Sequence, residues 1–253
     1  MIDLHSHLLP GVDDGSRSVE QSVKVLSRMA AAGITGVCLT PHLTATRSEQ
    51  GIPAAYDDAF VRLRAAVPER MALHRGVEMM LDRHLPPQAA ANRALTLGGS
   101  RYLLVEFTRM AAPTAVTNAM GHIVGLGLVP LLAHPERYAC CTPAVAAVWK
   151  GAGALLQVDA NTLFMPRSRG ERARQLVSAG LADILAADNH GDDRTVSAPF
   201  VSLCEQGGET QADLLLVRNP TAILADRLTE DVPPLPLRTS FLDRLKHLLD
   251  PEG

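Results

Sequence analysis

The chain alternates between two spacings of apolar residues. Between Ser18 and Ala32, apolar positions recur every three or four residues, which predicts an amphipathic helix that stops at Gly33. The next segment, 34–39, is short and mainly apolar, as expected of a buried strand, and it leads into Thr-Pro-His at 40–42. A helix followed by a strand is therefore the first repeat of the pattern.

The same alternation continues to about residue 225. Further helices are predicted at 54–67, 114–126, 143–152 and 171–180. Further strands are predicted at 72–76, 101–106, 128–133, 155–158 and 182–187. The segment 213–224 is expected to form a last strand and helix. Strands that alternate with helices indicate a parallel sheet covered by helices, and this number of repeats suits an α/β barrel.

Length and charge narrow the class of protein. A chain of 253 residues can form one α/β barrel domain. No apolar run reaches the ~18 residues that a membrane helix needs, so we expect a soluble protein without membrane insertion. The formal net charge of -3, with acids and bases interspersed, provides no basic field for a nucleic-acid backbone. Nucleic acid is therefore not the expected partner.

The cysteines indicate a reducing compartment and no thiol chemistry. Their spacing resembles neither a zinc clamp nor a secreted disulfide framework, and no targeting segment precedes Ile2, so we expect a cytoplasmic location. A cysteine phosphatase would carry an arginine six positions after its nucleophile. The residues at those positions are Thr44, Ala146, Ala147 and Thr210. If this protein cleaves phosphate, a cysteine does not do so.

Histidines and carboxylates collect at one end of the predicted strands. His5 and His7 stand at i and i+2 in the first strand and point to the same face, and Asp13 and Asp14 in the next turn can add oxygen ligands. Further candidates stand at or just after the carboxyl ends of later strands: His42, Glu78, Glu106, His134, Asp188 and His190. Barrel active sites are built at that end. The spread of these residues along the chain is therefore predicted to become one cluster.

A single histidine or carboxylate at a strand end is more often solvated or hydrogen-bonded than bound to metal. Solvation or hydrogen bonding explains less well why so many histidines and carboxylates stand at the same end of the predicted strands. Imidazoles and carboxylates without a thiolate suit Mn, Zn or Fe, and more candidates than one ion can use suggest a multinuclear centre.

The motifs resemble the polymerase-and-histidinol-phosphatase (PHP) superfamily, and within it the bacterial capsular and exopolysaccharide tyrosine-protein phosphatase branch. They are Ile-Asp-Leu-His-Ser-His at 2–7, Val-Asp-Asp-Gly at 12–15, Thr-Pro-His at 40–42, Gly-Val-Glu at 76–78, Leu-Val-Glu-Phe at 104–107, Leu-Ala-His-Pro-Glu-Arg-Tyr at 132–138 and Ala-Asp-Asn-His at 187–190. The resemblance implies a distorted seven-stranded β/α barrel over residues 1–225. It also implies three divalent metal ions, usually manganese, and a phosphotyrosine substrate.

The resemblance further implies a role for each candidate residue. The ligands implied for one metal are His5, His7, Glu78 and Asp188. Glu78 bridges to a second metal, whose other ligands are Glu106 and His134. The ligands implied for the third metal are Asp14, His42 and His190. The residues that match phosphate-binding arginines are Arg137 and Arg194.

Two departures from the branch pattern concern the last motif and the loops. The branch usually has Ser-Asp-Ala-His where this chain has Ala187-Asp188-Asn189-His190, and the segment to Arg194 is a residue short, which leaves the placement of that arginine open. The segments 44–53 and 108–113 match no family pattern. We expect them to shape the substrate pocket.

The expected reaction is hydrolysis of a phosphate monoester by metal-activated water, with the phosphotyrosine tail of a bacterial tyrosine kinase as partner. The same metal face also suits a small-molecule phosphatase of the histidinol-phosphate type or a phosphodiesterase. A barrel that only binds a phosphorylated partner is the alternative from another class. The closer match to the tyrosine-phosphatase branch favours phosphotyrosine.

Residues 226–253 are expected to be a C-terminal linker and a short helix. Val232 to Pro236 reads as a stiff, extended link. Leucines at 242, 245, 248 and 249 have the spacing of a short amphipathic helix, which would dock on the barrel or on a partner.

Overall fold

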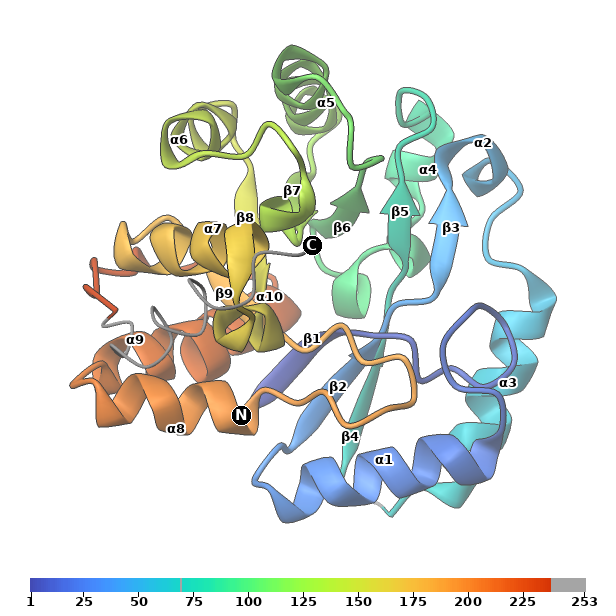
Figure 1. Ribbon diagram of the computed structural model, residues 1–253. Coiled ribbons are helices and arrows are strands. Elements are labelled where there is room, and N and C mark those ends of the chain that lie inside the picture. Colours follow the sequence, from blue (N-terminus) through green and yellow to red (C-terminus); the bar gives the residue numbers. More distant parts are fainter. Residues whose placement is uncertain (69, 238–253) are drawn as a thin grey trace.

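A computed structural model describes residues 1–68 and 70–237. Within these residues, nine β-strands form two parallel sheets, ordered β1-β2-β4 and β3-β5-β6-β7-β8-β9. Figure 1 shows helices α1, α3, α5, α6, α7 and α8 ranged around the outside of the strands. The strands are β1 Ile2–Ser6, β2 Gly36–Leu39, β3 His42–Thr44, β4 Ala72–Arg75, β5 Glu78–Met80, β6 Tyr102–Glu106, β7 Val129–Ala133, β8 Leu155–Asp159 and β9 Ile184–Ala186.

The two sheets touch on both sides. On one side β2 runs on into β3 and β4 into β5, and the Glu78 amide donates to the Pro41 carbonyl at 3.1 Å across that junction. On the other side, Ser6 and Asn189 form an isolated parallel bridge. Pro41 has no N–H to donate, which helps to explain why the ladder breaks there. The parallel α/β architecture is confirmed, whereas a single seven-stranded ring is not: the described strands divide between two sheets.

Four of the predicted helices lie within two residues of their expected bounds, namely α1 Val19–Ala31, α3 Ala54–Ala66, α5 Pro113–Gly125 and α6 Pro143–Gly151. The first begins as its sequence indicates, because the Ser18 hydroxyl accepts a hydrogen bond from the Gln21 amide at 3.2 Å. The remaining helices outside the C-terminal group are α2 Ala45–Ser48, α4 Pro87–Ala91, η1 Arg93–Leu95, η2 Leu97–Gly99, η3 Pro135–Arg137, η4 Ala160–Phe164, α7 Arg167–Ser178 and α8 Ser197–Glu205. Helix α7 begins earlier than the predicted residue 171, and α8 was not predicted.

The prediction of a last strand within 213–224 is wrong. This region is helical throughout, with α9 Glu209–Asp213, the π-helix η5 Leu214–Arg218 and α10 Asn219–Leu224. A short buried apolar run does not distinguish a strand from a buried helix. Here η5 and α10 pack against β9 and β1, so the apolar residues are buried by contact with the sheets.

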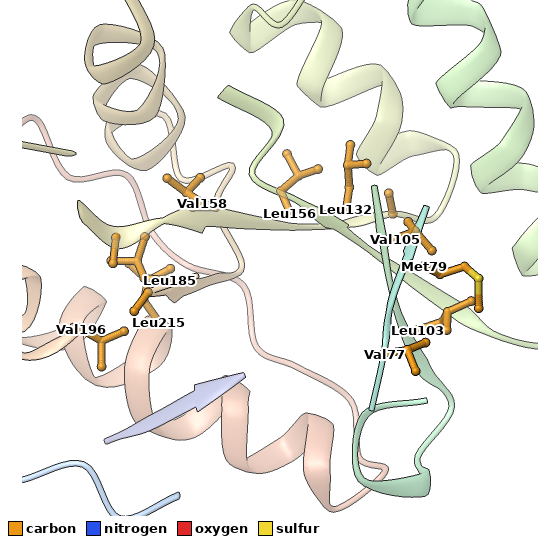
Figure 2. Close-up of a cluster of buried hydrophobic side chains, with 14 of the residues drawn as sticks. Val77, Met79, Leu103, Val105, Leu132, Leu156, Val158, Leu185, Val196 and Leu215 are labelled. Carbon is orange, nitrogen blue, oxygen red and sulfur yellow. The ribbon is translucent and has the colours of Figure 1, made fainter. Parts of the chain in front are cut away.

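Strands β2, β6 and β9 are buried on both faces along their whole length, whereas β4 is partly exposed. Figure 2 shows part of the larger hydrophobic cluster, in which Leu103 and Val105 of β6 lie near Met79. The alternate residues of the same strand, Tyr102 and Leu104, belong to a smaller cluster that draws side chains from both sheets. Strand side chains alternate between faces, so Glu106 follows Tyr102 and Leu104 on the second face. That face therefore ends in a candidate ligand.

The described part of the C-terminal segment packs against the helices. Gln211 Nε2 donates to the carbonyls of Pro233 and Pro234 at 3.3 Å, and the Leu237 amide donates to Ser178 Oγ at 3.1 Å. The predicted leucine-rich helix beyond lies outside the described residues. None of the helices in the described part of the chain combines the length and the apolar character needed to cross a bilayer.

Candidate metal centre

The structure brings all of the predicted metal ligands together. Seven of them lie near or after the carboxyl ends of strands: His5 in β1, His7 and Asp14 after it, Glu106 at the end of β6, His134 after β7, and Asp188 and His190 after β9. His42 and Glu78 instead begin β3 and β5, which follow directly on the carboxyl ends of β2 and β4. Parallel strands place their carboxyl ends at one face, which explains how residues so far apart in sequence meet.

The two N-terminal histidines each lie close to Glu78 and to Asp188. His5 Nε2 lies 3.2 Å from His7 Nε2 and 3.3 Å from both Glu78 Oε2 and Asp188 Oδ1. His7 Nε2 lies 3.2 Å from Glu78 Oε2 and 3.3 Å from Asp188 Oδ1. Ligands about 2.0 Å from a tetrahedral ion are separated by about 3.3 Å. These donor atoms therefore have the spacing of a metal site.

The outer nitrogens of the two N-terminal histidines are held by other side chains. His7 Nδ1 is 2.8 Å from Asp13 Oδ2, and His5 Nδ1 is 2.9 Å from Gln157 Oε1. An Nδ1–H that donates to an oxygen leaves Nε2 free to bind metal. Asp13, considered above as an oxygen ligand, instead orients His7. Gln157 was not predicted, and its only signal is a polar residue within an apolar strand.

Glu78 has the position of a bridging ligand. Its Oε2 lies 3.0 Å from His42 Nδ1 and also faces His5 and His7, whereas its Oε1 lies 2.8 Å from His134 Nε2. Glu106 Oε1 is 3.2 Å from the same His42 nitrogen. One carboxylate therefore contacts imidazoles from several strands.

A third group is more open to solvent. Asp14 Oδ1 lies 3.4 Å from His42 Nε2 and 3.5 Å from His190 Nε2, and Asp14 is 69% exposed. The ring of His7 stacks on that of His190 with a centroid separation of 4.2 Å. His7 therefore lies next to this group. The two ring nitrogens of His42 face different carboxylates: Nε2 faces Asp14, and Nδ1 faces Glu78 and Glu106.

The charge of the cluster favours cations. Burial acts to lower the pKa of His42, but hydrogen bonds to Glu106 and Glu78 raise it to about 10. Burial acts to raise the pKa of Asp188, but nearby His5 and other cationic groups hold that pKa far below its usual value. Asp188 therefore stays charged, and His42 holds a proton that a bound metal ion would displace.

Two candidate ligands adopt an uncommon backbone conformation. His134 has φ 34° and Asp188 has φ 49°, in the left-handed region that residues other than glycine rarely occupy. Such residues cost about 1–3 kcal/mol each and cluster at functional sites. The fold therefore maintains strain where it directs these two side chains.

Both predicted arginines lie beside Asp188. Arg137 Nη2 donates to Asp188 and, at 2.8 Å, to Asp159 Oδ2, whereas Arg194 Nη1 lies 3.5 Å from Asp188 Oδ2. Asp159 is buried and was not predicted. Although the segment before it is a residue short, Arg194 places its guanidinium next to the ligand cluster.

Asn189 builds the loop that carries Arg194. Its side chain is fully buried; Oδ1 accepts from the amides of Gly191 at 2.8 Å and Asp192 at 3.3 Å, and Nδ2 donates to the Arg194 carbonyl at 2.6 Å. An asparagine that bonds to nearby backbone is typical of tight turns. The residue noted above as a departure from the family pattern is therefore the one that shapes the shortened loop.

A cavity of about 330 Å³ opens onto this cluster. Besides candidate ligands, its walls include Met80, Phe107, Thr108, Arg109, Arg137 and Tyr138. The segment 108–113 thus contributes to the pocket as expected, whereas 44–53 does not line it. Among the described residues no cysteine lines the cavity, and burial raises the pKa of Cys141 to about 12.

Comparison with known proteins places the chain in a family. Residues 1–225 match the family described as capsular polysaccharide synthesis, CpsB/CapC. This chain belongs to the CpsB/CapC family. The match covers the segment predicted as the barrel, and it confirms the resemblance to the capsular and exopolysaccharide branch.

Members of the CpsB/CapC family resemble the chain over nearly its whole length. It is 26% identical over 243 residues to the tyrosine-protein phosphatase CpsB of Streptococcus pneumoniae, covering 90% of this chain and all of that protein. It is also 26% identical to the tyrosine-protein phosphatase YwqE of Bacillus subtilis, covering 94% and 97%. The similarity to both relatives therefore extends over most of this chain and nearly all of their own length.

Solved structures support the same fold. A structure from work on YwqE of B. subtilis and CpsB of S. pneumoniae, described as unique metal-dependent tyrosine phosphatases, superposes with a TM-score of 0.78 at 24% identity, covering 94% of this chain and 100% of that chain. The phosphotriesterase of Mycobacterium tuberculosis superposes with a TM-score of 0.59 at 12% identity, covering 88% and 93%. These likenesses concern the fold alone.

Proposed function

We propose that this chain is a metal-dependent protein-tyrosine phosphatase that acts on the phosphotyrosine tail of a bacterial tyrosine kinase in capsular or exopolysaccharide synthesis. The observation that carries the proposal is the shared cavity, whose walls contain Arg137 and seven of the nine candidate metal ligands, all except His5 and His7. Family membership and the names of the CpsB and YwqE relatives support the substrate class. A cytoplasmic location is part of the same proposal.

The proposed centre holds three divalent metal ions, with manganese preferred and zinc or iron as alternatives. The donor set supports it, because imidazole and carboxylate groups without thiolate suit these ions. His5, His7, Glu78 and Asp188 would hold one ion. Ions held there would supply a water of lowered pKa and positive charge against the phosphoryl oxygens.

For the second ion, the proposed ligands are Glu78, Glu106 and His134. For the third, they are Asp14, His42 and His190. The short contacts of His42 Nδ1 with Glu78 and Glu106 also make this histidine a candidate for the second ion. Glu78 would then be shared among neighbouring ions.

The protein's own residues would bind and orient the phosphoryl group. Arg137 and Arg194 are proposed to hold its oxygens, with Asp159 fixing the Arg137 guanidinium through the 2.8 Å contact. The leaving phenolate of tyrosine, with a pKa of ~10, needs only weak protonation. No covalent intermediate on the protein is required.

We also propose that residues 1–225 act as one distorted barrel and that 226–253 form a separate linker and helix. Joining β2 with β3 and β4 with β5 leaves seven strand segments. The amide of Asp188 donates to the His5 carbonyl at 3.0 Å, next to the Ser6–Asn189 bridge, which supports closure of the ring between β1 and β9.

The test is a substrate comparison. The purified full-length chain would be assayed on a phosphotyrosine peptide, histidinol phosphate and a phosphodiester, with and without Mn²⁺. We expect the peptide to give the highest kcat/KM, and only with metal. Histidinol phosphate as the best substrate by tenfold or more would contradict the proposed substrate class. Binding of the peptide without turnover would contradict the proposal that the chain is an enzyme.

A variant of a candidate ligand tests the metal centre separately. Glu78→Gln should lose metal and activity, whereas Glu205→Gln, at an exposed position of α8, is the matched control.

A further inference from the structure

Arg109 is an arginine of the cavity wall that the proposed mechanism does not use. It lies in the turn after β6 and lines the same cavity as Arg137. Its loop is fixed to the segment that follows Arg137: the Ala139 amide donates to the Arg109 carbonyl at 2.9 Å, and the Phe107 amide donates to Tyr138 Oη at 3.1 Å. The position of Arg109 at the cavity is therefore built into the fold.

Arg169 approaches the same region from helix α7. This helix packs on η3, which ends at Arg137, and Arg172 Nε holds the two together by donating to the Glu136 carbonyl at 2.8 Å. Burial and then the positive charges of Arg137 and Arg109 lower the pKa of Arg169. The two cavity-wall arginines and Arg169 thus lie close enough for their charges to interact.

The charges of these arginines are balanced differently. Arg137 is paired with Asp159 and Asp188. In the part of the chain that the structure describes, neither Arg109 nor Arg169 forms an ion pair with a carboxylate. An arginine whose planar donors are not matched by a carboxylate is suited to bind one from a ligand. Arg109 therefore adds positive charge to the cavity wall beyond what the phosphate site uses, and Arg169 adds more nearby.

We propose that Arg109 and Arg169 form a second anion subsite, which binds the carboxylate of an acidic residue flanking the phosphotyrosine. The inference rests on the proposed function and names its preferred substrate, an acidic phosphotyrosine peptide. The cavity of about 330 Å³ is at the small end of the range for ligand pockets, so the rest of a peptide passes over its mouth. Arg109 is exposed there and accessible to a neighbouring side chain.

The test compares two peptides that differ in one charge. One carries Asp and the other Asn beside the phosphotyrosine, and for binding both carry a non-hydrolysable phosphonate in place of the phosphate. Binding to the Mn²⁺-loaded full chain is measured by fluorescence anisotropy. We expect the Asp peptide to bind about two- to fivefold more tightly, in line with partly exposed ion pairs. Arg109→Gln and Arg169→Gln should each reduce this ratio, and the double variant should abolish it.

Arg64→Gln, on the exposed face of α3, is the matched control and should retain the ratio. Equal affinity of the wild-type protein for both peptides would overturn the inference, and so would a ratio that persists in the double variant. An equal loss of affinity for both peptides would also overturn it, because it would place these arginines on the phosphate itself. The proposed function fails separately, if the hydrolysable peptides are not turned over at all. Should Arg169→Gln fail to fold, the exposed Arg109→Gln variant decides.

Discussion

Replacing Arg137 with alanine tests how the cavity grips a phosphoryl group. A guanidinium has five N–H donors. Nη2 donates to Asp159 and Asp188, and Nε is buried without a partner. Among the described residues Nη1 has no acceptor, so it is the nitrogen left for a phosphoryl oxygen.

The magnitude follows from that geometry. A hydrogen bond to a charged group contributes about 1.5–3 kcal/mol, and removing one preorganised donor from a transition state costs about 2.7–4 kcal/mol. We therefore expect Arg137→Ala to lower kcat/KM on a phosphotyrosine peptide by about 2–4 kcal/mol, or about 30- to 1,000-fold. Arg137→Lys keeps a charge but not the planar fork and should recover only part of this loss.

The assay pairs steady-state kinetics with elemental analysis of the same samples. Arg137→Ala should keep its metal, whereas Glu78→Ala should lose metal with its bridging carboxylate. Arg64→Ala controls for the loss of an exposed arginine. Equal metal loss from Arg137→Ala and Glu78→Ala would refute the assignment of phosphate binding to one residue and metal binding to the other. An unchanged kcat/KM in Arg137→Ala would refute the proposal that Arg137 binds the phosphoryl group.

Three further predictions concern other residues. Asn189→Ala should lower kcat/KM about tenfold by releasing the loop of Arg194, and a double-mutant cycle with Arg194→Ala should be non-additive; purely additive losses would contradict this role. Burial raises the pKa of Asp3 to about 7, so the folded state retains a proton that the unfolded chain releases near pH 4. Stability should therefore fall as pH rises from about 4 to 7, and Asp3→Asn should remove on the order of 4 kcal/mol of that fall in urea unfolding; an identical pH slope would argue against it. Because burial raises the pKa of Cys141 to about 12, iodoacetamide at pH 8 should leave this thiol unmodified in the folded protein, which peptide mapping would check.

Sequence patterns predicted seven of the nine described strands, five of the six helices of nine or more residues, and the gathering of the candidate ligands at one face. Apolar periodicity marks an element because burial imposes it, and strand ends converge in any parallel sheet. His5 and His134 could therefore be placed at one site from chain order alone. The helical segment 213–224 was missed because its burial depends on contact with β1 and β9, which a local apolar run does not reveal.

The supporting residues were not predictable in the same way. Gln157 lies 2.9 Å from a ring nitrogen of His5 although 152 residues separate them, and nothing local marks that contact. Likewise, the role of Asp159 is visible only in the structure, where it accepts a hydrogen bond from Arg137. The left-handed backbone of Asp188 is imposed by its surroundings, since the intrinsic preference of aspartate opposes it. The sequence thus predicted the candidate ligands and the two arginines, but not the side chains that orient them.

Metal reconstitution tests the central claim most directly. The protein would be stripped with a chelator, checked for folding by circular dichroism, and titrated with Mn²⁺ while hydrolysis of a phosphotyrosine peptide is followed. We expect no turnover in the stripped protein, and recovery that requires more than one ion per chain. Full activity in a preparation shown by elemental analysis to be free of metal would contradict it.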